Sequence, residues 1–552
     1  MIDRSNISRK EYTTMGRSEG NEQIFAPCRE ACPAGIDVPR YIRHIRNGNF
    51  DEALATIRER IPFPSVCGHA CVAYCEIKCA RIQYDGAMAI RLLKRAAAEY
   101  GSDVQKRENA APTGKKVAIV GAGPGGLTAA YYCALKGHEV TVFESMPEAG
   151  GMLRYGIPEY RLPNTVLAKE IAFIENQGVK ITTNAKVEAP EVLRENGFDA
   201  VLVASGAWKA QKMGIDGEDF ANVLDGISFL TDVNKGKKPA IGKKVVVIGG
   251  GNTAIDAARA SLRLGADVQI LYRRTRPEMP ASAEEIGEAL NEAVVIEYLT
   301  APVRIGKGVV ECIRMKLGES DASGRPRPVP VAGSEYTVAC DTVIMAIGQS
   351  ADAASLGLAA NGNGTVTVNE ESLAMQQEGM FAAGDAVTGP SSIIEAIAQG
   401  RRASISIDMY LGGDGIIDTR EELADDSTIP DPEPRGTARA DADNVILEER
   451  LSGFGLTEKG YDRETAINEA CRCLSCDLRD YSVEVDSALC KDCGYCKEVC
   501  PLGVFQQSDT FNPGGYQPMV ATKTDRCVGC LNCLYVCPDF AIQINEKEND
   551  AA

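Results

Sequence analysis

Histidine and positive charge are both scarce in this sequence. Only three histidines occur among 552 residues (His44, His69 and His138), too few for His-rich zinc sites or for a Ser-His-Asp triad. Lysine and arginine number 59 against 77 aspartates and glutamates, which gives a formal net charge of -18. This acidic balance disfavours attraction to phosphate backbones or anionic lipid, so we expect no nucleic acid partner.

Long apolar runs are also absent. No stretch approaches the roughly 18 to 20 uninterrupted apolar residues of a membrane span. The N-terminal MIDRSNISRKEYTT lacks the apolar core of a signal peptide. We therefore expect a cytoplasmic protein with no membrane insertion, and its length suits three or four domains.

Cysteine, by contrast, is abundant, with 20 residues. A reducing compartment argues against disulfides and favours metal ligation or redox chemistry. Cys133, Cys312 and Cys340 lie in helix or strand patterns, and we expect them to be ordinary small core residues. The spacing of most other cysteines indicates their chemistry.

The most specific pattern is a duplicated cysteine run near the C-terminus. Each run reads CxxCxxCxxxCP, the spacing of bacterial two-cluster ferredoxins, in which three cysteines hold one 4Fe-4S cubane and the fourth crosses to the other. Thiolates are soft anionic ligands that suit iron, and the tight loop offers amides to the cluster sulfurs. A pair of zinc ribbons is the alternative, although zinc is rarely held by duplicated triplets. The predicted ligands are Cys490, Cys493, Cys496, Cys500, Cys527, Cys530, Cys533 and Cys537.

A first nucleotide-binding unit is marked by a glycine-rich turn. KKVAIVGAGPGGLTAAYYCALKGHEVTVFE combines an apolar strand, a turn with Gly121, Gly123 and Gly126, and an alanine-rich helix. Glu144 ends the next strand, where an acid should accept ribose hydroxyl groups while the helix N-terminus faces the pyrophosphate. A mere packing turn is the alternative, but strand, helix and acid together favour a dinucleotide site.

The same pattern returns in KKVVVIGGGNTAIDAARASLRLGADVQILYRR. Arg273 and Arg274 stand where an acid would serve NAD, and their guanidinium groups can fork onto a ribose 2′-phosphate. NADP(H) is therefore favoured over NAD(H), with a solvated basic edge as the alternative role of the two arginines. The predicted contacts in the turn are Gly249, Gly251, Asn252, Thr253 and Ala254.

These patterns predict a multidomain chain of mixed α/β and α+β class. Strands that alternate with helices indicate two Rossmann-like nucleotide-binding domains, for FAD and for an inserted NADPH site. The cysteine-rich first hundred residues carry helical patterning, and an acidic stretch rich in Pro, Gly and Asp follows Leu411. The predicted segments are a helical iron–sulfur domain (1–114), an FAD-binding domain in two parts (115–235 and 346–412), an NAD(P)H-binding domain (236–345), an acidic linker (413–470), a cysteine strap (471–479) and a two-cluster ferredoxin-like domain (480–552).

Four segments carry a resemblance to a known family. They are EAGGMLRYGIPEYRLP (148–163), VVVIGGGNTAIDAAR, DTVIMAIGQ (341–349) and GMFAAGDAVTGPSSIIEAIAQGRRA (379–403). They resemble the small subunit of NADPH-dependent glutamate synthase, and they are similar to the large subunit of NADH-dependent ferredoxin:NADP transhydrogenases. The resemblance covers roughly residues 25–410.

The resemblance implies how the cofactors are held. The first turn would bind FAD and the second NADPH, and the chain would return to complete the flavin site. Gly151, Arg154, Gly384 and Asp385 would then contact FAD, with Asp385 on a ribitol or pyrophosphate hydroxyl and the following helix facing the isoalloxazine.

The resemblance also suggests a role for CRCLSC (471–476). In this family a helical N-terminal domain holds two 4Fe-4S clusters, and its first motif reads RCLxC. Here that motif lies after the flavin domain, so it would have to return to the N-terminal cysteines. If CRCLSC instead binds a separate metal or stays free, the N-terminal cysteines suffice for one all-cysteine cubane. The implied ligands are Cys28, Cys79, Cys473 and Cys476 for one cluster and Cys32, Cys67, Cys71 and Cys75 for the other, with Cys471 unassigned. We expect His69 to support a cluster from outside its ligand set or to be exposed, with a competing ligand role as the alternative.

Together the motifs predict electron transfer. Nicotinamide donates two electrons as hydride, clusters accept one at a time, and a flavin can stand between them. We expect an NAD(P)H-dependent FAD and iron–sulfur oxidoreductase with no catalytic side chain. It would be a subunit of a larger redox complex, with other redox subunits or ferredoxin as partners and flavin-based electron bifurcation as a further hypothesis. The alternatives are a glutamate synthase small subunit that supplies NADPH electrons, and a non-catalytic iron–sulfur scaffold.

Overall fold

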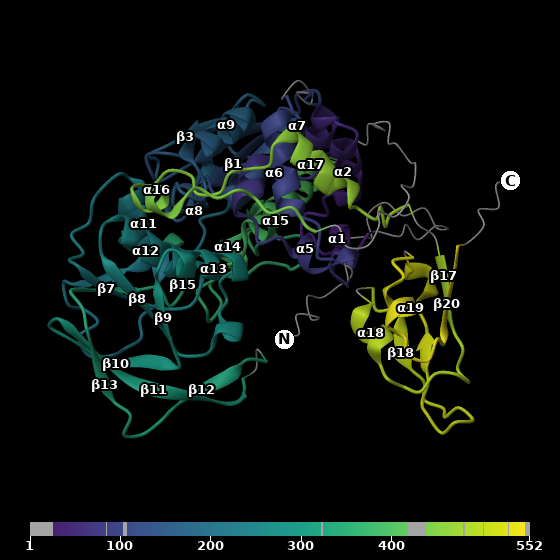
Figure 1. Cartoon of the computed structure of the whole chain (residues 1–552). Coiled ribbons are helices and arrows are strands. Elements are labelled where there is room, and N and C mark those ends of the chain that lie inside the picture. The colour runs from purple at the N-terminus through teal and green to yellow at the C-terminus, as the bar shows by residue number, and fades with distance from the viewer. Residues whose placement is uncertain are drawn as a thin grey trace. The chain divides into compact units, whose positions relative to one another are not determined.

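The computed structural model describes residues 26–83, 85–102, 108–321, 324–417, 438–478, 481–500, 502–527 and 529–546. They divide into two compact units, and Figure 1 draws the elements of the whole chain. Unit 1 comprises the described residues of 108–417 and 444–458, and unit 2 those of 26–102, 438–443 and 459–546. Residues 1–25 of the predicted N-terminal domain, residues 418–437 of the predicted linker and Pro501 lie outside the described residues.

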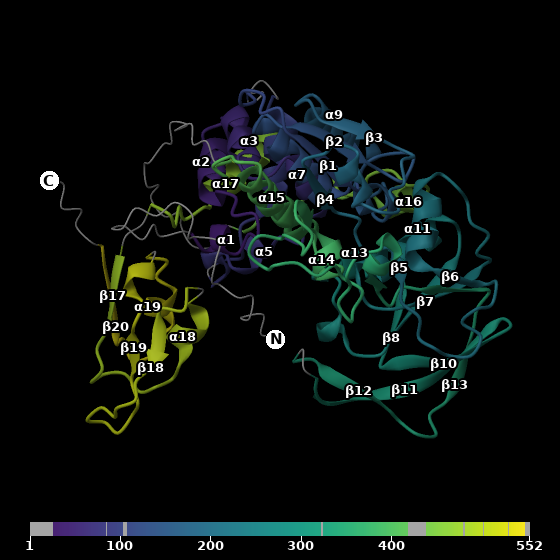
Figure 2. The same ribbon diagram turned by 180° about the vertical axis from the view of Figure 1, so that it is seen from behind.

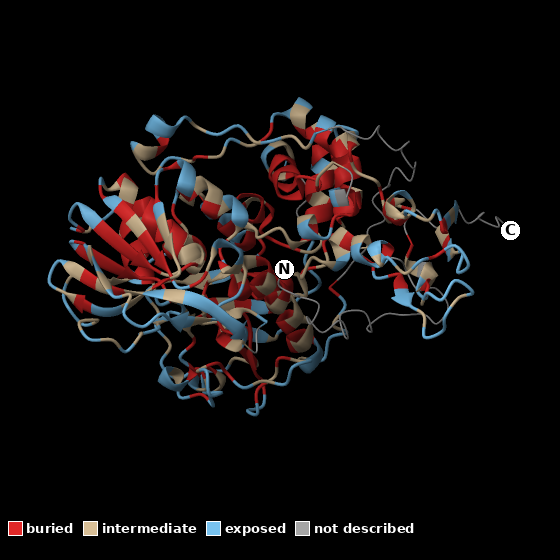
Figure 3. Cartoon of the chain, turned by 60° about the horizontal axis from the view of Figure 1, so that its bottom comes forward, coloured by how far each residue is buried: buried red, intermediate tan, exposed pale blue. Residues whose placement is uncertain are grey.

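The first sheet of unit 1 is parallel throughout. Residues 117–120 of its central strand are all buried, as expected when helices cover both faces of a parallel sheet. Figure 3 shows buried residues, in red, along the strands of the sheets. In spatial order the strands are β16 (Met380–Ala382), β4 (Ala200–Val203), β1 (Lys116–Val120), β2 (Glu139–Phe143) and β3 (Lys180–Thr182).

Two helices, α7 (Pro124–Leu135) and α15 (Ile393–Tyr410), pack tightly together beside this sheet. A Cβ at Gly400 would lie 2.1 Å from the carbonyl oxygen of Gly125, so only glycine allows the backbones to approach this closely. The helix α9 (Asn164–Glu175) packs against α7 as well. Strand β16 and helix α15 follow the second sheet in the chain, so the first sheet is completed by a returning segment.

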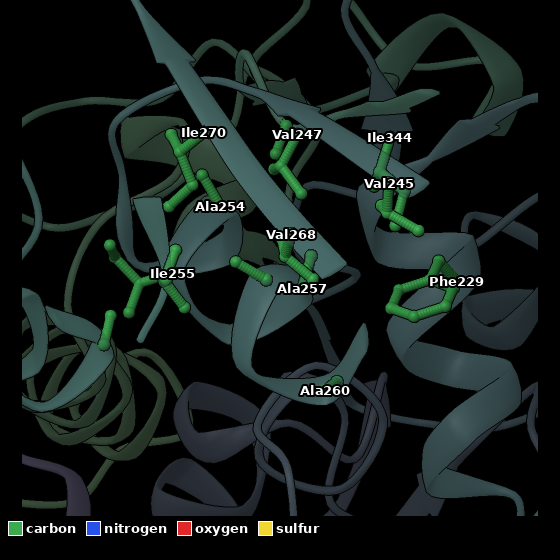
Figure 4. Close-up of a cluster of buried hydrophobic side chains, with 14 of the residues drawn as sticks. Phe229, Val245, Val247, Ala254, Ile255, Ala257, Ala260, Val268, Ile270 and Ile344 are labelled. Atoms are coloured by element: carbon green, nitrogen blue, oxygen red, sulfur yellow. The ribbon is translucent and has the colours of Figure 1, made fainter. Parts of the chain in front are cut away.

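The second sheet of unit 1 is also parallel. Figure 4 shows its core, in which valine and isoleucine side chains of the strands pack against Ala254, Ile255 and Ala257 of α12. The strands in spatial order are β6 (Val223–Asp225), β14 (Thr342–Met345), β7 (Lys244–Ile248), β8 (Asp267–Tyr272) and β9 (Val295–Tyr298), and the helices are α11 (Gly226–Asn234), α12 (Asn252–Arg263) and α13 (Ala283–Asn291).

An antiparallel sheet is inserted between β9 and β14, at the lower left of Figure 1. Its longest strand, β11, pairs with the other three. The strands are β10 (Thr300–Gly306), β11 (Val309–Ser320), β12 (Pro326–Pro330) and β13 (Tyr336–Ala339). The remaining elements of unit 1 are β5 (Lys209–Ala210), β15 (Gln349–Ser350), α8 (Met152–Tyr155), α10 (Val192–Glu195), α14 (Asp385–Thr388), α16 (Leu447–Leu451) and the 3-10 helices η2 (Arg276–Glu278) and η3 (Ala353–Leu356).

Unit 2 begins with a bundle of short helices. One helix from a distant part of the chain, α17, packs against α2 and α6, and Figures 1 and 2 both show it beside α2. The interval predicted as linker thus contributes helices α16 and α17 in its described residues. Among the helices of the described chain, none combines the length and apolar character needed to cross a membrane. The helices are α1 (Pro27–Glu30), α2 (Val38–Arg46), α3 (Phe50–Arg58), α4 (Pro64–Ala70), α5 (Tyr74–Ile77), η1 (Ala80–Gln83), α6 (Ile90–Tyr100) and α17 (Arg463–Cys471).

The C-terminal part of unit 2 is a small repeated fold of two antiparallel strand pairs and two short helices. Each half supplies one cysteine run, which begins before a short helix and ends after it. With the parallel sheets and the helical N-terminal region, this confirms the predicted multidomain fold. The elements are β17 (Tyr481–Val485), α18 (Tyr495–Val499), β18 (Phe505–Gln507), β19 (Met519–Ala521), η4 (Thr524–Arg526), α19 (Asn532–Val536) and β20 (Ile542–Glu546).

Candidate nucleotide and iron–sulfur sites

The first glycine-rich turn connects β1 to α7 and leaves one glycine open. A Cβ at Gly121 would lie 2.4 Å from the carbonyl oxygen of Ala204, and one at Gly126 would lie 2.1 Å from the carbonyl oxygen of Gly121. Both positions therefore exclude a side chain. A Cβ at Gly123 would meet no atom within 4 Å, so the backbone there is accessible to a pyrophosphate.

Glu144 lies beside this turn and is 6% exposed. Its carboxylate accepts hydrogen bonds from the backbone N–H groups of Ala122 at 2.9 Å and Met146 at 2.8 Å. These bonds hold the acid just beyond β2, where a dinucleotide site needs it for the ribose. The ribose contact itself stays a prediction.

The Gly384–Asp385 segment lies against the same turn. A Cβ at Gly125 would come within 3.7 Å of the Cα of Gly384. Burial raises the pKa of Asp385, although its carboxylate accepts hydrogen bonds from the N–H and hydroxyl of Ser391 at 3.1 and 2.8 Å. The structure therefore brings two predicted flavin-binding segments together, although more than 250 positions separate them in the sequence.

A third predicted segment also reaches this turn. Gly151 has a positive φ of 54°, and a Cβ there would lie 2.8 Å from the Cα of Gly123. The Arg154 guanidinium pairs with Glu148 at 2.6 Å and donates to the carbonyl of Ala149 at 2.7 Å. Gly151 thus lies at the open glycine, whereas Arg154 is fixed by its own loop.

The second glycine-rich turn repeats the geometry of the first. A Cβ at Gly249 would lie 2.1 Å from the carbonyl oxygen of Ala346, whereas a Cβ at Gly251 would meet nothing closer than 3.9 Å. Asn252, Thr253 and Ala254 form the first turn of α12. A nucleotide can therefore reach the backbone at Gly251, as at Gly123 in the first turn.

The two predicted phosphate-binding arginines differ in the structure. Arg274 is 5% exposed and donates to the carbonyl of Pro326 at 2.8 Å and to Asp321 at 3.0 Å, so it is held by the β11–β12 hairpin. Arg273 is exposed. Its guanidinium is the one left available to an incoming phosphate, and Arg276, also exposed, lies three residues further on.

Four cysteines from opposite ends of the sequence meet in unit 2, and we call them the Cys28 set. Burial raises the pKa of Cys28, and the nearby thiols of Cys79, Cys476 and Cys473 raise it further. The structure therefore brings together the four residues that the resemblance assigns to one cluster. Their binding of iron stays a prediction.

The CLSC turn of this set has the same backbone conformation as two CxxC turns of the ferredoxin-like region. Ser475, the third residue of C473-L-S-C476, has a φ of 47°. Asp492 in C490-K-D-C493 and Gly529 in C527-V-G-C530 occupy the same position with φ of 58° and 60°. A positive φ is uncommon for residues other than glycine, so its recurrence at this position indicates one turn type that suits a cluster-binding loop.

Buried ion pairs hold the CLSC turn against the N-terminal helices. Arg472 is 1% exposed and donates to Asp85 at 2.8 Å, to the carbonyl of Gly86 at 2.9 Å and to Glu469 at 2.7 Å. Arg81 donates to the carbonyl of Arg472 and pairs with Asp85 at 2.7 Å. We call these residues the latch.

A second ion pair lies on the other side of the turn. Arg43 of α2 is 2% exposed and donates to Asp477 at 2.8 Å, across 434 positions of sequence. Arg43 and Asp477 also influence the pKa of Cys473, which burial raises to about 11. The two cysteines of the turn are thus flanked by an ion pair on each side.

The Cys32 set, which is Cys32, Cys67, Cys71 and Cys75, lies in the N-terminal helices. Burial raises the pKa of Cys32 and of Cys75; the thiol of Cys71 adds to both rises, and the thiol of Cys32 adds to the rise at Cys75. A hydrogen bond from Cys67 lowers the pKa of Cys71 to about 6. The amide of Ala73 also donates to the Cys71 sulfur at 3.4 Å. The structure brings these four predicted ligands together as well.

A cavity marks the Cys490 set, which is Cys490, Cys493, Cys496 and Cys537. All four cysteines line it, and it encloses about 290 Å³ of space, part of which is open to solvent. Backbone amides of Met519 and Ala541, which also line it, donate to the Cys490 and Cys537 sulfurs at 3.3 and 3.4 Å. Amides directed at thiolates around a cavity fit an iron–sulfur cluster.

The Cys500 set, which is Cys500, Cys527, Cys530 and Cys533, groups in the same crossed manner. Burial raises the pKa of Cys533, and the thiols of Cys530, Cys527 and Cys500 add to the rise. Three cysteines of the second run thus lie with the fourth of the first run, as the bacterial two-cluster spacing predicts.

Within the described residues, no three His, Cys, Asp or Glu side chains lie close enough to hold a single metal ion. A cubane separates its thiolates by a core of several atoms, so its ligands stand farther apart than those of one zinc ion. The ring of His69 bonds to the carbonyl of Ser65 at 2.9 Å, within its own helix. Cys133, Cys312 and Cys340 are buried in unit 1, as expected for core residues.

Two parallel sheets with glycine-rich turns, flanked by cysteine-rich domains, define an NAD(P)H-dependent oxidoreductase that uses FAD and iron–sulfur clusters. The chain belongs to the pyridine nucleotide-disulphide oxidoreductase family, whose model matches residues 115–400. Residues 23–106 match the model of dihydropyrimidine dehydrogenase domain II, 4Fe-4S cluster, and residues 489–541 match the 4Fe-4S dicluster domain. These matches confirm the predicted flavoenzyme with 4Fe-4S domains at both ends.

Three similar proteins extend this likeness. The chain is 41% identical to the NADP(+)-dependent formate dehydrogenase subunit beta of Moorella thermoacetica over 82% of this chain and 71% of that protein. It is 40% identical to the NADPH-Fe(3+) oxidoreductase subunit beta of Geobacter sulfurreducens over 84% and 78%. The glutamate synthase [NADPH] small chain of Azospirillum brasilense is 34% identical over 69% and 86%. The predicted resemblance to glutamate synthase small subunits is therefore confirmed.

Proposed function

We propose that this chain is the NADP(H)-linked electron-transfer subunit of a larger redox complex, with one FAD and four 4Fe-4S clusters. One observation carries the proposal: four separate sets of four cysteines group in unit 2, and two of these sets adjoin. Burial raises the pKa of Cys476 in the Cys28 set, and the thiol of Cys530 in the Cys500 set adds to the rise. Sixteen thiols in such groups suit a chain of clusters.

The contact between these two sets supports an order of electron transfer. The side chain of Asn532, which follows Cys530 closely, donates to the carbonyl of Ala80, next to Cys79, at 3.0 Å in a buried position. Arg526 and Glu30 add an ion pair at 2.9 Å. Cys75 of the Cys32 set also influences the pKa of Cys28, after burial and the thiols of its own set. The order is therefore the Cys32, Cys28, Cys500 and Cys490 sets, with Cys493 exposed at the far end.

The protein's part in this reaction is to hold and orient. When bound, FAD exchanges two electrons with a nicotinamide and single electrons with iron–sulfur clusters. The open glycines Gly123 and Gly251 give two nucleotides access to helix N-termini. The cysteine thiols would hold the clusters, and the amides of Ala73, Met519 and Ala541 donate to three of their sulfurs. No side chain is required to move a proton in the electron-transfer steps.

Titration of the anaerobic chain with NADPH tests the proposal. We expect flavin bleaching, followed by electron paramagnetic resonance signals of reduced clusters. Iron analysis should give about sixteen irons per chain, four for each cubane. Absence of bleaching would refute the nucleotide reaction, and a reproducible value near twelve would remove one of the four clusters.

Arg273 is proposed to read the 2′-phosphate. Arg273→Ala should weaken NADPH binding roughly tenfold or more and leave NADH nearly unchanged, because a charge-assisted bond to phosphate is lost. Arg274→Ala is the matched control, since Arg274 is occupied by Asp321 and Pro326 and should affect stability rather than coenzyme preference. The reverse pattern would assign the phosphate to Arg274.

The relatives support two finer candidates. The subunit beta proteins from Moorella and Geobacter favour a partner that supplies or accepts electrons in a complex, and the transhydrogenase resemblance adds ferredoxin-linked bifurcation as a hypothesis. The Azospirillum relative favours electron supply to glutamate synthesis, for which the ferredoxin-like domain is an addition. Native co-purification separates them, because a glutamate synthase large subunit would be recovered only in the second case.

A further inference from the structure

Ser475 lies between two predicted ligands and has a buried hydroxyl. Its side chain is completely inaccessible to solvent, between Cys473 and Cys476 in the CLSC turn. Among the described residues its Oγ has no hydrogen-bond partner. A buried hydroxyl without a partner is costly, so native structures supply an acceptor in most such cases.

The backbone around Ser475 is already engaged. Its N–H group donates to the Cys473 sulfur, which lowers the pKa of that thiol against the dominant effect of burial. Its carbonyl oxygen accepts from the amide of Leu478 at 3.0 Å. Only the hydroxyl is left without a partner, at the centre of a turn whose thiols belong to the Cys28 set.

We propose that the Ser475 hydroxyl donates a hydrogen bond to a sulfur of the iron–sulfur cluster held by the Cys28 set and raises its reduction potential. The inference rests on the proposed function, since it needs a cluster at these cysteines. Cluster sulfides and thiolates are acceptors, and they supply what the hydroxyl lacks among the described residues. The bond requires no proton transfer and leaves the ligand set unchanged.

The sign of the effect follows from charge. One-electron reduction adds negative charge to a cluster that already carries four thiolates, and the electron comes from the NAD(P)H and FAD reaction of this enzyme. A hydrogen-bond donor stabilises the more negative, reduced form more than the oxidised form. Ser475 therefore makes this cluster a better acceptor, at the step that leads to the Cys500 set.

Two substitutions isolate the hydroxyl from the backbone. Ser475→Ala removes the hydroxyl and keeps a side chain at a φ of 47°. Ser475→Gly removes it too but relaxes the positive φ, which glycine adopts without strain. Ser487→Ala, at an exposed serine near Cys490, is the matched control. All are compared with the unaltered full chain, reconstituted with iron and sulfide and titrated anaerobically under electron paramagnetic resonance.

We expect the reduction potential of one cluster to fall by the same amount in both Ser475 variants. Loss of one bond to a charged acceptor should change the reduced-to-oxidised ratio roughly five- to tenfold, and tenfold corresponds to about 59 mV for one electron. The iron content should equal that of the unaltered chain, and Ser487→Ala should shift no reduction potential. A change in one Ser475 variant alone would assign the effect to the backbone and overturn the inference.

Other outcomes also decide the question. Full iron with unchanged potentials in both variants would overturn the inference while the proposed function stands. Loss of about four irons from both would overturn it too, because Ser475 would then serve assembly rather than potential. Failure of the proposed function itself is distinguishable, because the unaltered chain would then bind no cluster at Cys473 and Cys476, and Cys473→Ser would leave the iron content unchanged.

Discussion

The two iron–sulfur regions of unit 2 place similar thiol sets by different means. In the ferredoxin-like region all eight cysteines lie within residues 490–537, and tight turns and short helices bring each set together. In the N-terminal region the Cys28 set draws on residues almost 450 positions apart, and buried ion pairs hold the distant turn. The same CxxC turn geometry occurs in both regions. Residues close in sequence therefore determine the conformation of the CxxC turn, whereas tertiary contacts determine its placement in the N-terminal region.

The sharpest test of this difference is removal of one thiol from each region. Cys473→Ser should cost the N-terminal region one cluster, about four irons, and leave the ferredoxin pair intact. Cys530→Ser should do the reverse, with the loss confined to the Cys500 set. Iron analysis with electron paramagnetic resonance measures both. Unchanged N-terminal signals in Cys473→Ser would contradict the Cys28 set.

Breaking the latch should lower the free energy of unfolding more than breaking any single ion pair of the ferredoxin-like region. Arg472→Met leaves Asp85 and Glu469 buried with less compensation, and breaking a buried pair of this kind costs about 3–5 kcal/mol. The free energy of unfolding of the N-terminal region should fall by this order, as measured by denaturant unfolding with a probe for each region. Equal loss in both regions would mean that they unfold as one unit.

The sequence predicts the features set by residues close together in the chain, and it misses the contacts between residues far apart in it. The eight ferredoxin cysteines, both glycine-rich turns and the two sheets follow from spacing and periodicity. The grouping of Cys473 with Cys28 rests only on the family resemblance, because no local pattern joins them. The partners Arg472–Asp85 and Arg43–Asp477 lie 387 and 434 positions apart, and none of these residues is distinctive alone.

The arginine pair and Ser475 show the same limit of prediction from sequence. Arg273 and Arg274 look alike in the sequence, and only the fold shows that Asp321 and Pro326 already hold Arg274. Ser475 looks like an ordinary small residue within CLSC, and only its burial and its hydroxyl without a partner distinguish it. In both cases the signal is a contact, which composition and spacing do not contain.

A buried lysine gives a smaller test within the N-terminal region. Lys94 of α6 is 3% exposed. Burial lowers its pKa, but the thiols of the Cys32 set, with Cys71 foremost, outweigh this and raise it. Lys94→Met should therefore lower the potential of the N-terminal cluster on this set by at least roughly 1 kcal/mol of redox free energy, because a buried positive charge is lost. Redox titration under electron paramagnetic resonance measures the shift.

Exposed Lys78, adjacent to Cys79, supplies the control for this prediction. Lys78→Met removes the same charge beside a ligand of the Cys28 set, but solvent screens it, so its effect on every reduction step should be much smaller. Lys94→Arg keeps the charge and should restore most of the potential. Equal shifts in Lys94→Met and Lys78→Met would show that burial is irrelevant.

The smallest expected effect is at the ion pair between the two regions. Arg526 and Glu30 are 20% and 31% exposed, so their interaction at 2.9 Å should contribute no more than about 1 kcal/mol and should weaken with salt. Arg526→Ala should leave all clusters and the unfolding of each region nearly unchanged. Its measurable consequence is kinetic: after rapid mixing with NADPH, reduction of the ferredoxin pair should slow modestly, and more so at high salt, because the adjoining Cys28 and Cys500 sets are held together less firmly. If Arg526→Ala matched Arg472→Met in its cost to stability, the contact between the regions would be as essential as the latch, and the distinction between local and distant placement of thiols would no longer hold.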